Sequence, residues 1–273
     1  MVAVVVSAIC PLMSQPNDQC ERADEALHGM VLEVLEETLP GGWYRVRTPY
    51  RYEGYVSCEH LLFGEEYAAR WADAAKQEVI KGFCDVLAGP SVCCYALDTL
   101  PRGAQVIANG KPDESGWVQV TLADGRQGYT KQSFLQPHCD APRYAEEAAL
   151  RRAVTETAKL YLGTHYRWGG KTPMGIDCSG LVSMAYWLNG VTIWRDASIR
   201  EGFPIHAIPR EAMQPGDPLF FPGHVAMYLG DGKYIHSTAK NGSDGVVINS
   251  LNPADPDYRE DLDKGMTAVG SLF

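Results

Sequence analysis

A cysteine stands in a local pattern that suits nucleophilic catalysis. It lies in the run Asp177-Cys178-Ser179-Gly180-Leu181, directly before apolar residues at helical spacing. We therefore expect Asp177 to cap a helix whose first turn contains Cys178. A helix N-terminus carries partial positive charge and free N–H groups, which favour a thiolate and can hold an oxyanion. For a lone cysteine, the alternative is a buried residue without any chemistry.

Two histidines flank a predicted β-hairpin downstream of this cysteine. Segments 225–229 and 233–237 have strand character around the turn Gly230-Asp231-Gly232. A hairpin folded at Gly230–Asp231 would place His224 close to opposite His236, so that the two can be cross-strand neighbours on one face. One imidazole would then accept the thiol proton while the other orients it, which predicts a Cys–His–polar constellation. Either histidine by itself is explained as well by packing.

The elements that must position these residues are of two kinds. From Arg143 onward, apolar residues recur at helical spacing before the cysteine, and strand-like segments follow it. This texture predicts an α+β unit over residues 143–273. Before it, segments 31–35, 43–48 and 117–122 read as short strands punctuated by turns, as in small β-barrels.

The β-rich half contains an internal repeat with an offset of 74 residues. The pattern Gly29, Gly42-Trp43, Gly54-Tyr55, Leu61 recurs as Gly103, Gly116-Trp117, Gly128-Tyr129, Leu135. Two long copies indicate a duplicated small domain rather than a solenoid. We expect all-β barrels at residues 1–63 and 79–137, joined by a helical linker at 64–78.

Composition limits the classes of function. The chain has 273 residues, of which 45% are hydrophobic, and a formal net charge of −10. An acidic surface is repelled by nucleic acid, and no stretch approaches the roughly 20 apolar residues that span a bilayer. Residues 1–11 read as a first strand rather than a signal peptide, since no Lys or Arg precedes Arg22. We therefore expect a cytoplasmic protein.

The eight cysteines form no CxxC pair. The pattern argues against a zinc ribbon and favours reduced thiols, although counting leaves disulfides open. Since a thiol supplies the nucleophile, we predict no metal and no cofactor.

The motifs of the second half resemble those of the NlpC/P60 cysteine peptidases. They are Tyr-x-Trp-Gly-Gly from Tyr166, Asp-Cys-Ser-Gly-Leu from Asp177, Pro-Gly-Asp from Pro215, Gly-His-Val-Ala-Met-Tyr-Leu-Gly from Gly223, and Ile-His-Ser from Ile235. The resemblance implies a papain-like α+β domain that carries Cys178 on a helix and His224 and His236 on an antiparallel sheet. It implies cleavage of the bond between γ-D-glutamate and a diamino acid. It further implies that Tyr166 supports the oxyanion and that the glutamyl site is lined by Trp168, Asp177 and Ser179.

The first half resembles two bacterial SH3 domains. The whole layout is similar to the YkfC-like γ-D-glutamyl-diamino acid endopeptidases of the dipeptidyl-peptidase VI type. That resemblance implies a first barrel that closes the groove around a free N-terminal L-Ala of a murein tripeptide or tetrapeptide. It also implies that Asp196 holds the α-amino group, with help from the first barrel, for which the candidates are Glu53, Tyr52 and Tyr50. A solvated surface acid is the alternative for Asp196.

Two other functions remain open at this point. The chain could be a secreted or wall-associated endopeptidase anchored by its SH3 domains, or a wall-fragment binding protein without activity. A monomer that binds neither membranes nor nucleic acids is expected in each case, and the sequence does not distinguish diaminopimelate from lysine as the third residue.

Overall fold

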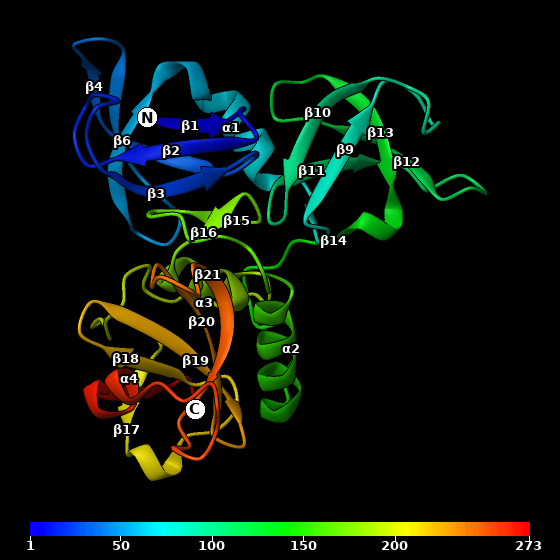
Figure 1. The fold of residues 1–273 in the computed structure, drawn as a ribbon. Coiled ribbons are helices and arrows are strands. Elements are labelled where there is room, and N and C mark those ends of the chain that lie inside the picture. Colours follow the sequence, from blue (N-terminus) through cyan, green and yellow to red (C-terminus); the bar gives the residue numbers. More distant parts are fainter. The chain divides into compact units, whose positions relative to one another are not determined.

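The chain forms two compact units, Met1–His138 and Cys139–Phe273 (Figure 1). The computed structural model describes residues 1–273, apart from the side chains of residues 37–39. In the described part, no helix is both long and apolar enough to cross a bilayer. The predicted fold class is confirmed, since all-β sheets fill the first unit and helices pack on an antiparallel sheet in the second.

The first half of the N-terminal unit is a seven-stranded antiparallel sheet. Its strand order is β3-β2-β6-β5-β4-β1-β7. Alternating apolar residues such as Cys10 and Leu12 are fully buried, as expected of strands with one core-facing side. The strands are β1 (Val2–Val5), β2 (Ile9–Met13), β3 (Arg22–Leu27), β4 (Val31–Leu39), β5 (Trp43–Arg47), β6 (Glu53–Ser57) and β7 (Leu61–Phe63), with the 3-10 turn Cys58–His60 before β7.

The second half of this unit repeats the same topology. Its order, β10-β9-β13-β12-β11-β8-β14, matches the first sheet strand for strand. Trp43 pairs with Ser57 across β5 and β6, and Trp117 pairs with Lys131 across β12 and β13. The sequence repeat is therefore a repeat of the fold. The strands are β8 (Lys76–Val79), β9 (Phe83–Leu87), β10 (Ala96–Pro101), β11 (Gln105–Asn109), β12 (Trp117–Thr121), β13 (Gln127–Lys131) and β14 (Leu135–Pro137).

Helix α1 (Glu65–Asp73) connects the two sheets. The indole N–H of Trp71 donates to Gly29 O at 2.8 Å, and the Ala123 N–H donates to His28 Nε2 at 2.9 Å. These contacts hold both sheets in one unit. The helix is shorter than the segment expected as a linker, 64–78, because Lys76–Val79 already pair as β8.

The C-terminal unit places a central helix against a six-stranded antiparallel sheet. Helix α3 (Cys178–Trp187) contacts β19 and β20, and α2 (Glu147–Lys159) packs beside α3 (Figure 1). The sheet order is β17-β22-β18-β19-β20-β21. Its strands are β17 (His206–Ile208), β18 (Pro218–Phe221), β19 (His224–Gly230), β20 (Lys233–Thr238), β21 (Gly245–Ser250) and β22 (Ala268–Ser271).

Local sequence explains both long helices. Leu150, Val154 and Ala158 line the buried face of α2, and Gly163 follows its end with a positive φ of 81° that favours glycine. Helix α3 is apolar nearly all round, as suits a helix enclosed in a core. The short hairpin of β15 (Lys171–Thr172) and β16 (Gly175–Ile176) precedes α3, and α4 (Glu260–Gly265) precedes β22.

Candidate active site

Cys178 is the first residue of α3, and Asp177 is its N-cap, as the local pattern predicts. Asp177 Oδ1 accepts a hydrogen bond from the Gly180 N–H at 2.6 Å. A Cβ on Gly180 would lie 2.2 Å from Gly170 O. Only glycine therefore lets the preceding loop approach the first turn of the helix this closely.

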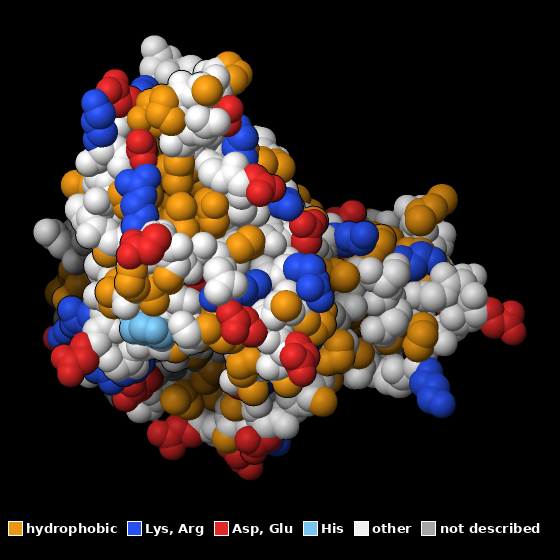
Figure 2. Space-filling view, turned by 90° about the horizontal axis from the view of Figure 1, so that it is seen from below, with side chains coloured by type: hydrophobic (Ala, Val, Ile, Leu, Met, Phe, Trp, Pro, Cys, Tyr) orange, Lys and Arg blue, Asp and Glu red, His pale blue; other side chains and the backbone are white. Residues whose placement is uncertain are grey.

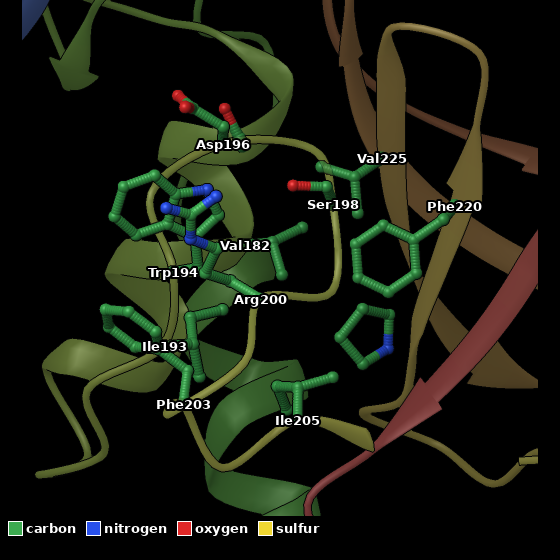
Figure 3. Close-up of a pocket in the computed structure, with 12 residues that line it drawn as sticks. Val182, Ile193, Trp194, Asp196, Ser198, Arg200, Phe203, Ile205, Phe220 and Val225 are labelled. Atoms are coloured by element: carbon green, nitrogen blue, oxygen red, sulfur yellow. The ribbon is translucent and has the colours of Figure 1, made fainter. Parts of the chain in front are cut away.

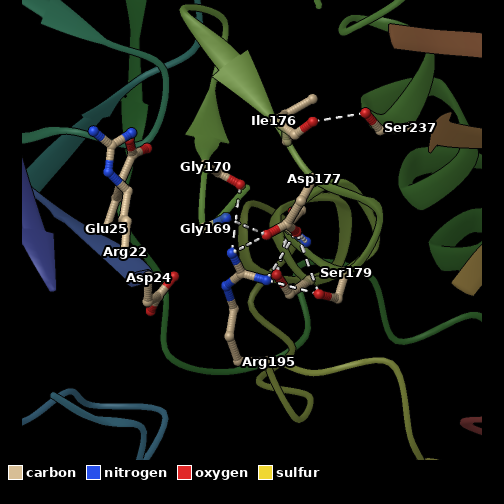
Figure 4. Close-up of polar contacts among 12 residues, drawn as sticks. Arg22, Asp24, Glu25, Gly169, Gly170, Ile176, Asp177, Ser179, Arg195 and Ser237 are labelled. Atoms are coloured by element: carbon tan, nitrogen blue, oxygen red, sulfur yellow. Dashed lines mark hydrogen bonds and ion pairs between the residues drawn. The ribbon is translucent and has the colours of Figure 1, made fainter. Parts of the chain in front are cut away.

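A buried arginine holds this helix end in place (Figure 4). Arg195 is 2% exposed, and its guanidinium donates to both carboxylate oxygens of Asp177, at 3.0 and 2.9 Å, and to Ser179 Oγ at 2.8 Å. Asp177 also accepts from the Gly169 N–H at 2.9 Å. The Asp177 carboxylate is thus occupied by protein donors, which makes it a positioning group rather than the substrate contact that the resemblance implies.

The surroundings of the thiol differ from the expected ones. Burial raises the pKa of Cys178 to about 11, and the charge of Asp177 raises it further. The backbone N–H groups of Val225 and Ser179 act against this increase by donating toward the sulfur. The effect of burial on the pKa therefore exceeds that of the helix N-terminus. Cys178 is a neutral thiol rather than the thiolate that the sequence pattern favours.

The two histidines meet, but not in the predicted register. Met227 pairs with Ile235 and Tyr228 with Tyr234, and a bulge follows between Tyr228 and Gly230. The turn residues are Asp231 and Gly232, later than the predicted centre at Gly230, and the bulge moves the pairing by one residue. The resulting register differs by two residues from the predicted one, so the histidines are diagonal neighbours on one face. Their rings still touch, since His224 Nε2 lies 2.8 Å from His236 Nδ1.

A hydrogen-bond chain sets the tautomer of both rings. The Asn249 amide donates to Asp257 O at 2.8 Å, which leaves Asn249 Oδ1 to face His236 Nε2 at 2.9 Å. His236 must therefore carry its proton on Nε2 and accept at Nδ1. The His224 Nε2–H donates to that nitrogen, so the lone pair of His224 lies on Nδ1.

Both rings are neutral at ordinary pH. Burial lowers the pKa of His224 to about 3, and the charge of His236 lowers it further. Burial also lowers the pKa of His236 to about 4, against the hydrogen bond with Asn249. A neutral imidazole whose free lone pair is on Nδ1 is equipped to act as a general base.

Tyr166 lies beside the thiol. The pKa of its hydroxyl is raised by burial first, and then by Cys178 when that thiol is ionised and by the charge of Asp177. It stays protonated and can donate a hydrogen bond to an oxyanion. Trp168, two residues later, is 59% exposed and leaves a broad indole surface for a ligand.

A pocket lies between α3 and the β18–β19 side of the sheet (Figure 3). Ser179 and Val225, whose backbone N–H groups point at the Cys178 sulfur, both contribute to its lining. Asp196 and Ser198 are polar residues of the lining, and Val182 and Phe220 form apolar walls. The structure thus brings Ser179 and Asp196 into one pocket.

The residues expected from the first barrel lie in the N-terminal unit, where they have contacts of their own. The Glu53 carboxylate accepts from Arg45 and Arg47, each at 2.7 Å, and the pKa of Glu53 is lowered chiefly by Arg47. The Tyr50 hydroxyl donates to Asp24 Oδ2 at 2.5 Å. The Tyr52 N–H donates to Thr48 Oγ1 at 3.0 Å. Two arginine partners make Glu53 a poor candidate for binding an ammonium group.

Sequence reasoning missed Arg195 and Asn249. Arg195 directly precedes Asp196. A buried positive partner for the Asp177 carboxylate could have been expected from the sequence, but the chain contains many arginines that could fill this role. No local signal distinguishes Asn249. Among the described side chains, no group of three or more His, Cys, Asp or Glu residues could hold a metal ion, and all eight cysteines are free thiols.

Residues 163–258 match the NlpC/P60 family, and residues 12–61 match the bacterial dipeptidyl-peptidase Sh3 domain, a single match rather than two. Dipeptidyl-peptidase 6 of Lysinibacillus sphaericus is 45% identical over 276 residues, which cover 100% of both chains. The gamma-D-glutamyl-L-lysine dipeptidyl-peptidase of Bacillus cereus is 33% identical, and the match covers 87% of this chain and 72% of that protein.

A crystal structure of an NlpC/P60 family protein from Bacillus cereus has the same fold. It matches with a TM-score of 0.80 at 21% identity, over 98% of each chain.

Proposed function

Because the chain belongs to the NlpC/P60 family of cysteine peptidases, we propose that it cleaves the γ-D-glutamyl–diamino acid bond of murein stem peptides that begin with a free L-Ala. The hydrogen-bond chain from Asn249 through His236 to His224 carries this proposal, because it leaves a base at His224 Nδ1. The names of the two relatives, a dipeptidyl-peptidase and a gamma-D-glutamyl-L-lysine dipeptidyl-peptidase, support the substrate class.

The neutral resting state defines the first chemical step. His224 Nδ1 takes the proton of Cys178 while the sulfur attacks the γ-carbonyl carbon of the glutamyl residue. The negative charge moves to the carbonyl oxygen, where the Tyr166 hydroxyl and the N–H groups at the start of α3 stabilise it. His224 then returns the proton to the departing amine of the diamino acid, and a thioester remains.

The second step regenerates the enzyme. His224 Nδ1 takes a proton from water, the resulting hydroxide attacks the thioester, and the dipeptide L-Ala-D-Glu leaves with a new carboxyl group, whose proton passes to the solvent. The thiolate recovers its proton from His224. Besides the peptide, water is the reactant of this step.

The pocket would favour a peptide with a free N-terminus. Asp196 lines it together with Ser179, the neighbour of Cys178, and its carboxylate would bind the α-ammonium of the L-Ala residue. Ser179 would contact the glutamyl residue in the same pocket, and Trp168 would cover it from the exposed side. Tyr50 and Tyr52 remain the candidates from the first barrel, whereas the two arginine partners of Glu53 disfavour it as a ligand for an ammonium group.

We propose that the two barrels are a duplicated pair of SH3 domains. The family match covers only the first sheet, and the identical strand order supports a second, diverged copy. We propose the domain limits 1–63, 79–137 and 143–273, and a role for the first barrel in closing the groove. The acidic chain would work in the cytoplasm, on tripeptides and tetrapeptides released during wall recycling.

Mass spectrometry of the products tests the function directly. L-Ala-γ-D-Glu-diaminopimelate and its lysine counterpart should each yield the dipeptide, and Cys178→Ala should abolish the reaction. The N-acetylated peptides should remain intact. Equal turnover of acetylated and free peptides would refute the pocket for a free N-terminus, and no turnover of any of them would refute the peptidase proposal.

A further inference from the structure

The N-terminal unit contains a pocket remote in sequence from the catalytic residues. It is a hollow of about 380 Å³ in the first barrel, lined by Trp43, Met13, Ser57, His60, Asp18 and Glu59 among others. This volume is enough for an amino-acid side chain. The lining combines an indole with two carboxylates.

The second barrel shows what an equivalent indole binds. Lys131 is the cross-strand partner of Trp117, and its Nζ lies 4.0 Å from the ring centroid. The same ammonium donates to Ser115 O at 2.7 Å. The second barrel therefore carries its own cation on the face of its repeated tryptophan, in an arrangement favoured by the ring quadrupole.

The first barrel lacks that cation. The cross-strand partner of Trp43 is Ser57, whose short side chain leaves the position of the lysine open as part of the pocket. The two acidic residues of the pocket also have no acidic counterpart at the equivalent positions of the second barrel. Asp18 and Glu59 line the pocket, whereas the residues 74 positions later are Val92 and Ser133. One copy thus supplies an ammonium, and the other offers an open indole with two carboxylates.

We propose that this pocket binds a primary ammonium group on a flexible chain, such as the side chain of a diamino acid. The ammonium would take the place that Lys131 Nζ has in the second barrel, with Asp18 and Glu59 as counter-charges. Binding of an ammonium stands on the geometry alone. Its assignment to a diamino acid of wall peptides rests on the proposed function.

The experiment tests whether cadaverine, the probe, binds at the face of the Trp43 indole. The full chain is labelled with 5-fluorotryptophan, and Trp43→Phe identifies the ¹⁹F resonance of Trp43 among the six tryptophans. Cadaverine should shift this resonance saturably, whereas 1-pentanol, which lacks the charge, should not. L-lysine should bind and Nε-acetyl-L-lysine should bind at least about tenfold more weakly. A Trp43 signal that ignores cadaverine would overturn the proposal.

The matched variant transfers the lysine from one barrel to the other. Ser57→Lys should fill the pocket with an internal ammonium and weaken cadaverine binding at least about tenfold. The second barrel shows that the fold accepts this pair, and unchanged peptidase activity with five unmoved tryptophan signals confirms folding. The reciprocal Lys131→Ser exposes Trp117, where Val92 and Ser133 take the positions of the two pocket acids, and should create only a much weaker site. Undiminished cadaverine binding in Ser57→Lys would overturn the proposed site, whether or not the peptidase assay supports the proposed function.

Discussion

The two sides of the active site are held by different forces. On the helix side, Cys178 is positioned by a buried ion pair between Asp177 and Arg195. On the hairpin side, His224 is positioned by neutral hydrogen bonds through His236 and Asn249. The comparison teaches that charge is used where only a backbone must be fixed, and neutral groups are used where a proton must move. A permanent charge beside the base would shift its pKa away from the working range.

Removal of the base gives the largest expected effect on the hairpin side. His224→Ala should lower kcat for L-Ala-γ-D-Glu-diaminopimelate by at least about 10³-fold, because it removes the imidazole that accepts the Cys178 proton. KM should change little. The measurement is steady-state kinetics by product chromatography, with Trp168→Phe as the control for general damage to the site. Full activity in His224→Ala would remove this histidine from the mechanism.

Arg195→Met tests the charged side. It leaves the Asp177 carboxylate buried without its partner, and we expect a loss of about 3–5 kcal/mol in the free energy of unfolding. The pair Asp177→Asn with Arg195→Met should recover part of this loss, since no unpaired charge remains. Urea unfolding of both variants measures the difference. Equal stability of the single and the double variant would contradict a role for the ion pair.

Stability should depend on pH through the hairpin side. The pKa values of His224 and His236 lie at about 3 and about 4, below the usual 6.5 of an unfolded chain, which therefore binds more protons. Their contribution is complete above pH 6.5 and is lost as the pH falls, by about 2 kcal/mol per histidine at pH 5. Urea unfolding at pH 7.5 and pH 5 tests this. His236→Gln should show a smaller pH effect than the parent.

Asn249 gives the smallest and sharpest test. Asn249→Ala frees the tautomer of His236 and should lower kcat about tenfold, the worth of one hydrogen bond. Asn249→Asp keeps an acceptor but adds a negative charge, which should raise the pKa of His236 and move the acidic limb of the kcat profile to higher pH. A residue with a purely structural role would not move that limb, so an unchanged pH profile in Asn249→Asp would reject the relay.

The parts of the fold set by near neighbours in the chain were predictable. The cap at Asp177, the first turn at Cys178 and the hairpin turn at Gly230–Gly232 depend on hydrogen bonds within a few residues. The 74-residue repeat also follows from sequence, because equal patterns fold into equal topologies. These features include the thiol and both histidines of the proposed mechanism.

The remaining features depend on groups that are distant in the chain. The bulge after Tyr228 moves the register by one residue, the Asn249 amide reaches His236 from the next strand, and Arg195 contacts Asp177 only in the packed core. Burial reverses the expected charge of Cys178, since desolvation depends on everything packed around the sulfur. The sequence alone determined which chemical groups are present and which local turns present them. The tertiary structure decided their protonation and their partners, because both depend on distances and on exclusion of water, which no local pattern contains.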